Sequence, residues 1–465
     1  MQHAITGSGG GDGGRPDCAG AHVTVQARPE RRLIPHTASQ RYVEFVVRVD
    51  DAPDAPATDR PPIALALVLD RSGSMSGDKI TTAKRAALAV LQRLDARDTL
   101  AVVVFDEHID TIQPLARVTD AVKANVRAEL DRIGARGSTA LHEGWLTGCN
   151  ALVADEIAAL EPGIARCFLL TDGLANVGLT DAEQIASQAG GIRAHAGIGT
   201  STFGIGGDYA EELLGPMAEA GGGRFHHLRT PDEIATTFVN ELGELLATVA
   251  ARVELDLEVE PRVGVAFIST YQRTSAPDQT ADQGTEPPTR WTIALGDLMS
   301  GEKRHAVVQL GFAETWRRET QTIRARVRWV ARGTEHATDW QVVRFTYASQ
   351  AECDCEQPNA DVLRMVGQHQ SDRAQREALR ESKAGHMVRA HAVLRRVKTE
   401  IAAYAGDDAD LAHELAEIEE LEQQMAEAPL PSLASKERYH ILQSKTSGQR
   451  DLRTPPTGGT KKPGS

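Results

Sequence analysis

The spacing of apolar residues predicts an α/β unit between residues 62 and 248. Short apolar runs alternate there with longer segments of helical periodicity. Continuous apolar runs are typical of parallel strands, because such strands are buried on both faces of the sheet. Strands that alternate with helices predict a doubly wound, mostly parallel sheet. The predicted strands include residues 63–69, 100–105, 167–170 and 200–203.

Two of the intervening helical segments carry a start signal. "TDAE" at 180–183 and "TPDE" at 230–233 each place Glu three residues after Thr, which is the spacing of a capping box. Pro231 adds the proline that is common at the first helical position. We therefore expect these two helices to begin directly after Thr180 and Thr230.

On both sides of this unit, apolar and polar residues alternate, which indicates half-buried strands. Residues 251–348 contain several such runs with turns between them, and these predict an antiparallel β-sandwich. Residues 21–50 hold only two runs, too few to fold alone. We expect them to join the sandwich, so that the α/β unit is inserted within it.

The ends of the chain have other patterns. Residues 1–20 are rich in glycine and are expected to be disordered. Residues 360–445 are helical, and two apolar stripes separated by "AGDDAD" predict a C-terminal α-helical hairpin. Residues 446–465 are expected to form a disordered tail. The stripes are Met387, Ala390, Leu394, Val397 and Ile401, then Leu411, Leu415, Ile418, Leu421 and Met425.

Composition narrows the class of protein. The net charge of −14 over 465 residues argues against a nucleic-acid partner, which would favour a basic face. No run of 18 apolar residues occurs, so no membrane span is expected. Five cysteines are too few for a disulfide framework, and the N-terminus lacks the pattern of a secretory signal. These features favour a cytoplasmic location.

Oxygen-bearing side chains follow two of the predicted strands. Asp70 ends the first strand, Ser72 and Ser74 follow it, and Asp172 ends a later strand. Thr139 lies in a loop just before a predicted helix. In an open parallel sheet, ligands bind beyond the carboxyl ends of the strands, so these side chains are expected to converge. Hard oxygen donors of this kind suit Mg²⁺, and Mn²⁺ fits as well.

Three segments carry a resemblance to a known family. "DRSGSM" at 70–75, "GSTAL" at 137–141 and "LLTDG" at 169–173 resemble the metal-ion-dependent adhesion site of a von Willebrand factor type A domain. The resemblance covers residues 62–248 and implies a Rossmann-like, Mg²⁺-dependent protein-binding domain. It also implies the ligands Asp70, Ser72, Ser74, Thr139 and Asp172. The whole chain is similar to bacterial proteins of this class.

Plainer interpretations exist for each signal. The motif Asp-x-Ser-x-Ser alone is weak evidence for a metal site, because its serines could equally be loop or helix-capping residues. Its position at a strand end, together with the two further motifs, favours the metal site. "GSMSGDK" at 73–79 lacks the spacing of a phosphate-binding loop. Cys353 and Cys355, in "CDC", have no second cysteine pair, which favours two loop thiols over a metal clip.

The sequence predicts a non-enzymatic interaction module that presents Mg²⁺ to an acidic side chain of an unidentified partner protein. One alternative is an accessory subunit of an ATPase-driven complex-remodelling or metal-insertion system; the chain has no ATPase motif of its own. A metal-dependent hydrolase is a weaker alternative. Self-association, with an acidic residue of one copy at the site of another, also stays open.

Overall fold

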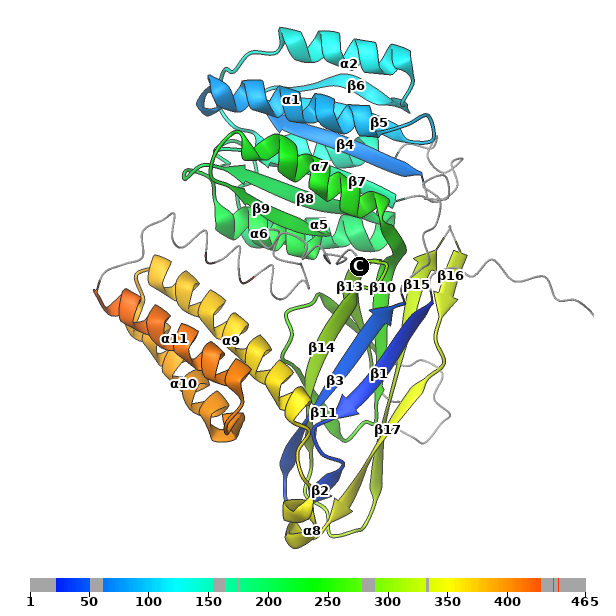
Figure 1. The fold of residues 1–465 in the computed structure, drawn as a ribbon, viewed down its shortest axis with the longest axis vertical. Helices are drawn as coiled ribbons and strands as arrows, with labels where there is room; N and C mark the ends of the chain where they lie inside the picture. Colours follow the sequence, from blue (N-terminus) through cyan, green and yellow to red (C-terminus); the bar gives the residue numbers. More distant parts are fainter. Residues whose placement is uncertain are drawn as a thin grey trace, which may run out of the picture.

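Figure 1 shows the computed structural model of the chain. The predictions of disorder at residues 1–20 and 446–465 lie outside the residues that the structure describes. So does part of the predicted helical region 360–445. The described residues are 22–50, 62–153, 164–173, 175–277, 289–331 and 334–427, with Arg438 and Leu442.

The α/β unit is built on a six-stranded sheet in the order β6-β5-β4-β7-β8-β9. All neighbours pair in parallel except β6, which pairs with β5 in the antiparallel sense. The central strands β4, β5 and β8 are buried at every residue, which explains their continuous apolar runs. The strands are β4 (Ile63–Asp70), β5 (Thr99–Phe105), β6 (Ile109–Arg117), β7 (Ile164–Thr171), β8 (Ile198–Ile205) and β9 (Gly222–Leu228).

Helices cover both faces of this sheet and form a hydrophobic core on each side. One core takes residues from α1 (Asp78–Arg93), α2 (Asp120–Arg132) and α7 (Glu233–Leu246). The other takes residues from α3 (Leu141–Ala151), α5 (Ala182–Ala196) and α6 (Glu211–Ala220). This three-layer arrangement is the predicted doubly wound fold.

The predicted helix starts are wrong by one or two residues. The residue before α5 is Asp181, whose side chain accepts a hydrogen bond from the N–H of Gln184. Thr180 lies one residue outside this cap. α7 follows Asp232, without a side-chain cap, rather than Thr230. Thr and Asp both cap helices well, so neighbouring candidates compete and local spacing does not decide between them.

Two further sheets enclose one core below the α/β unit (Figure 1). The first has the order β1-β3-β14-β11, and the second β12-β13-β10-β15-β17-β2, with β16 beside β15. One pair departs from the predicted antiparallel pattern: β2 runs parallel to β17. The strands are β1 (Val23–Pro29), β2 (Leu33–Pro35), β3 (Ser39–Val49), β10 (Thr248–Val259), β11 (Val263–Phe267), β12 (Arg273–Pro277), β13 (Thr289–Met299), β14 (Lys303–Phe312), β15 (Thr320–Ala331), β16 (Thr334–Ala337) and β17 (Gln341–Ala348).

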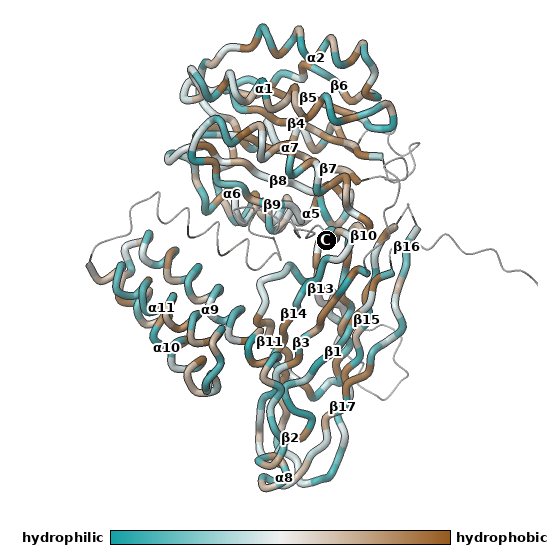
Figure 2. The backbone as a smooth tube through the Cα atoms, viewed as in Figure 1, coloured by the Kyte–Doolittle hydropathy of each residue, from teal (hydrophilic) through white to brown (hydrophobic). Residues whose placement is uncertain are grey.

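The α/β unit is inserted between strands of this pair of sheets. β3 precedes it in sequence and β14 follows it, yet the two strands pair along ten residues from Ser39↔Phe312 to Arg48↔Lys303. Val43, Phe45 and Val47 of β3 are fully buried in the shared core. Figure 2 shows brown, hydrophobic stretches along the strands, and teal and brown that alternate along the helices.

The C-terminal part is helical. α8 (Gln350–Cys355) is followed by α9 (Ala360–Lys383), α10 (Met387–Ala405) and α11 (Ala409–Glu427). The two apolar stripes lie in α10 and α11 and meet residues of α9 in one core. Among the described helices, none has the length and apolarity needed to cross a membrane.

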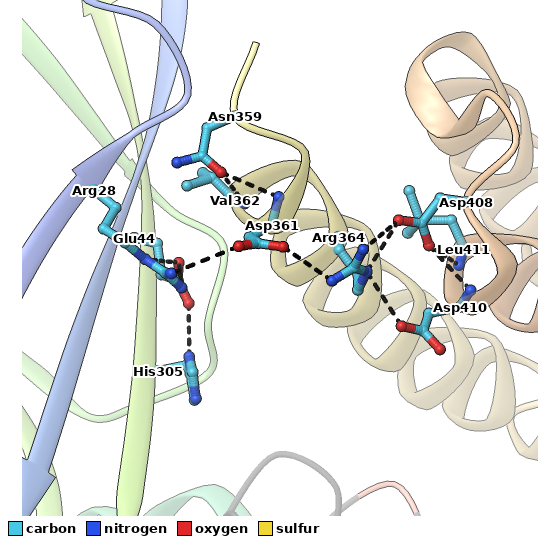
Figure 3. Close-up of polar contacts among 10 residues, drawn as sticks. All are labelled: Arg28, Glu44, His305, Asn359, Asp361, Val362, Arg364, Asp408, Asp410 and Leu411. Atoms are coloured by element: carbon cyan, nitrogen blue, oxygen red, sulfur yellow. Dashed lines mark hydrogen bonds and ion pairs between the residues drawn. The ribbon is translucent and has the colours of Figure 1, made fainter.

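A chain of charged side chains joins the first sheet to these helices (Figure 3). Arg28 of β1 donates to the fully buried Glu44 of β3 and lies 3.9 Å from Asp361 of α9. Arg364, one turn further along α9, pairs with Asp361 at 3.1 Å and with Asp408, before α11, at 2.8 Å. These contacts orient α9 on the sheet and α11 on α9.

A buried cluster of charged side chains joins the α/β unit to the sandwich. Asp297 of β13 accepts hydrogen bonds from Arg166 of β7 at 2.6 Å and from Arg193 of α5 at 2.5 Å. The backbone N–H of Arg252 donates to the same carboxylate at 2.8 Å. Burial alone would raise the pKa of Asp297, but Arg193, Arg166 and this N–H outweigh it and lower the pKa to about 2.

We expect Asp297→Asn to destabilise the chain at neutral pH. The change leaves two arginines buried without a counter-charge, which costs about 3–5 kcal/mol in the free energy of unfolding. The native pKa of about 2 is below the ordinary 3.8, so the stabilisation is present above pH ~4 and is lost as pH falls through about 2. Urea unfolding of both proteins should therefore show a difference that shrinks under acid.

The matched control is Asp131→Asn, because Asp131 is exposed on α2. It should unfold like the wild type at every pH. Equal stability of wild type and Asp297→Asn at neutral pH would show that the cluster does not hold the two parts together.

A fragment of residues 251–348 should not fold by itself. It lacks β3, so one whole edge of β14 and the core residues around it become exposed to water. Circular dichroism in the near ultraviolet should show no fixed tryptophan environment for the fragment. A chain in which residues 22–50 are linked to 251–348 should regain that signal; a folded fragment without them would contradict the expectation.

Candidate metal centre

Asp70 is the last residue of β4, and its side chain is fully buried. The backbone N–H of Ser72 donates to Oδ1 at 2.7 Å, and the hydroxyl of Thr171 donates to Oδ2 at 2.5 Å. Thr171 ends the neighbouring strand β7, where the register pairs Leu69 with Leu170. The carboxylate is thus held at the carboxyl edge of the sheet by groups on both strands.

The surroundings of Asp70 disfavour its negative charge. Burial raises its pKa to about 6, although hydrogen bonds from Thr171 and Ser72 lower it in part. The nearby charge of Asp172 also raises it. Two buried carboxylates this close repel each other, and a cation between them would relieve that repulsion.

The two serines lie between these carboxylates. Ser74 belongs to a 3₁₀ turn, Gly73–Met75, and its hydroxyl donates to Oδ1 of Asp172 at 2.7 Å. The hydroxyl oxygens of Ser72 and Ser74 are 3.1 Å apart. The spacing of two therefore brings both hydroxyls together, with Ser72 on the side of Asp70 and Ser74 on Asp172.

Thr139 reaches the site from the loop between α2 and α3. Its N–H donates to Oδ1 of Asn176 at 2.9 Å, and its carbonyl accepts from the N–H of Asn176 at 3.2 Å. A Cβ atom on Gly173 would lie 3.4 Å from Oγ1 of Thr139 and 3.5 Å from Oγ of Ser74. Both hydroxyls thus flank Gly173, the residue that follows Asp172, and a Cβ there would be in ordinary van der Waals contact with them.

The structure brings together all the side chains that the sequence predicted to converge. The donors are two carboxylates and three hydroxyls, and all but Ser74 are buried. This set of hard oxygens fits Mg²⁺ or Mn²⁺, and it lacks the sulfur and imidazole ligands that softer metals favour. The predicted residues are Asp70, Ser72, Ser74, Thr139 and Asp172.

Sequence reasoning missed residues that orient this set. Thr171 holds Asp70, Asn176 holds the Thr139 loop, and Lys79 of α1 donates its ammonium group to Oδ2 of Asp172. Thr171 directly precedes Asp172 in the sequence, so its position next to a predicted ligand could have indicated its role. Lys79 and Asn176 act across long separations, so nothing in the local pattern indicates them.

Two other groups of possible metal ligands are less suited to hold an ion. Asp106, Glu107 and His108 have ligand atoms within 4.8 Å of one another, but Asp106 is paired with Arg71 at 3.0 Å and Arg136 at 2.7 Å. Cys353 and Cys355 lie in the short helix α8, not in a loop as expected. The first is buried and the second is exposed.

Comparison with known proteins supports the fold of the α/β unit. Residues 64–241 match the family described as von Willebrand factor type A domain. An uncharacterized protein of Synechocystis sp., sll0103, is 29% identical over 54% of this chain and 57% of its own length. The uncharacterized YfbK of Escherichia coli is 30% identical over 48% of this chain and 37% of its own length. The chain thus aligns with only about half or less of these relatives.

A solved structure extends the likeness beyond that unit. The von Willebrand factor type A protein from Catenulispora acidiphila superposes over 92% of this chain and 98% of its own, with a TM-score of 0.68 and 17% identity. At that identity the likeness concerns the fold. The family match, the bacterial relatives and the doubly wound sheet together identify residues 64–241 as a von Willebrand factor type A domain.

Proposed function

We propose that this chain is a metal-dependent protein–protein interaction module. Von Willebrand factor type A domains are typically protein–protein interaction modules. The observation that carries the metal dependence is the convergence of Asp70, Asp172 and three hydroxyls at one sheet edge. The proposed ion is Mg²⁺, with Mn²⁺ as a substitute, and the proposed partner group is a carboxylate.

Each residue has a separate part in this proposal. Asp70 and Asp172 supply the negative charge that attracts a cation, while Ser72, Ser74 and Thr139 supply neutral oxygens. A bound Mg²⁺ would offer a Lewis-acidic position to a carboxylate oxygen of the partner. The two carboxylates would balance the charge of the ion, and a coordination position that the five donors leave open could still take the partner's carboxylate oxygen.

We propose binding rather than catalysis at this edge. The hydroxyls of Ser72 and Ser74 are engaged with each other and with Asp172. Within the described part of the chain, no histidine contacts either hydroxyl, so neither serine has the histidine base that commonly activates a serine nucleophile. This arrangement suits a ligand-holding role.

We expect Mg²⁺ to raise the thermal stability of the wild type and to have no effect on Asp70→Asn. An ion that binds only the folded state stabilises it by about 3 kcal/mol at 100 times its dissociation constant. Asn keeps the shape of the side chain but removes the charge. Thermal unfolding in Mg²⁺ and in EDTA, with Asp131→Asn as control, measures the difference. An equal response of wild type and Asp70→Asn to Mg²⁺ would contradict the assigned site.

Partner binding should depend on the same residue. In a pull-down from host lysate, the wild type in Mg²⁺ should retain a protein that is lost in EDTA and lost with Asp70→Ala. Equal capture in all three conditions would mean that another surface binds. A rise in mass of the isolated chain on addition of Mg²⁺, measured by light scattering, would instead indicate self-association through the site.

A further inference from the structure

Lys79 makes a contact that the metal-site hypothesis leaves unexplained. Its ammonium group donates to Oδ2 of Asp172, while Ser74 donates to Oδ1 of the same carboxylate. Asp172 is fully buried, and the Lys79 side chain is 27% exposed. Both oxygens of this carboxylate therefore already have donors from the chain itself.

We propose that Lys79 is a built-in cation that competes with the divalent ion at Asp172 and so weakens the affinity of the site for metal. The inference rests on the proposed function, because it concerns the same site. It assigns a role to a residue outside the five predicted ligands.

The position of Lys79 in its helix supports a role at the site. Lys79 is the second residue of α1, where the positive end of the helix dipole disfavours a basic side chain. Asp78, beside it, is the residue type that this end favours. Lys79 thus occupies a position that is unfavourable for the helix, and its carboxylate partner lies at the metal centre.

Arg71, the basic residue next to Asp70 in the sequence, does not pair with the carboxylates of the site. Arg71 directly follows Asp70, but its guanidinium pairs with Asp106 at 3.0 Å and with Asp110 at 2.5 Å. Asp70 accepts hydrogen bonds from Ser72 and Thr171, neither of which is charged. In the described part of the chain, Lys79 is the basic side chain that the structure places on a carboxylate of the site.

The charges decide the direction of the effect. Asp70 and Asp172 together bring two negative charges, and Lys79 cancels one of them. A divalent ion would therefore enter a site of net charge −1 in the wild type and −2 without the lysine. Lowering the negative charge weakens the attraction for a cation and leaves the loaded site with a net positive charge.

A purely structural role predicts the opposite result. If Lys79 only held Asp172 in place, its removal would loosen that carboxylate and weaken metal binding. The sign of the change in affinity thus separates the two roles.

The experiment measures Mg²⁺ affinity by calorimetry on the chelator-treated 465-residue chain. We expect Lys79→Gln to bind Mg²⁺ about tenfold more tightly than the wild type, because a neutral amide no longer competes or repels. Lys79→Arg keeps the positive charge and should stay within about twofold of the wild type. The matched control is Lys84→Gln on the same helix, because the ammonium of Lys84 donates to the carbonyl of Ile133, away from the site.

Thermal unfolding in EDTA checks that each variant is folded before titration. Affinity that is unchanged or weaker in Lys79→Gln, while the wild type binds Mg²⁺, would overturn the role of Lys79 and leave the proposed function intact. Binding by Lys79→Gln but not by the wild type would support the competition. Binding by neither would overturn both proposals.

Discussion

Two buried carboxylates at the ends of neighbouring parallel strands are the constraint around which the candidate site is built. β4 and β7 pair in register, so Asp70 comes beside Thr171 and near Asp172. Buried like charges raise the free energy of the folded state unless donors or cations oppose them. The hydroxyls, the backbone N–H of Ser72 and the Lys79 ammonium at this edge supply that compensation.

The rest of the molecule holds this edge away from the sandwich. Arg166 lies near the start of β7 and pairs with Asp297 of the sandwich, whereas Asp172 directly follows the end of β7. A strand of eight residues spans about 26 Å at 3.3 Å per residue. The anchored edge and the candidate metal edge are therefore opposite ends of the same strand, and the site faces away from the contact that fixes the unit.

The α/β unit is joined closely to the sandwich. α7 ends at Leu246, and β10 begins at Thr248, so only Ala247 separates the last helix of the von Willebrand factor type A domain from the sandwich. At the other end, β3 and β14 pair around the insertion. Together with the buried Asp297 cluster, the short α7–β10 junction attaches the α/β unit to the sandwich at its C-terminal end and at its surface.

The sequence by itself determined the α/β class and the convergence of Asp70, Ser72, Ser74, Thr139 and Asp172. Strand periodicity is local, and the ends of parallel strands must meet at one edge. Only the tertiary structure decided the parallel pairing of β2, the first residues of α5 and α7, the Asp297 cluster and the contact of Lys79 with Asp172. Such contacts join residues that are far apart in the chain or choose between equivalent neighbours, and no local pattern encodes that choice.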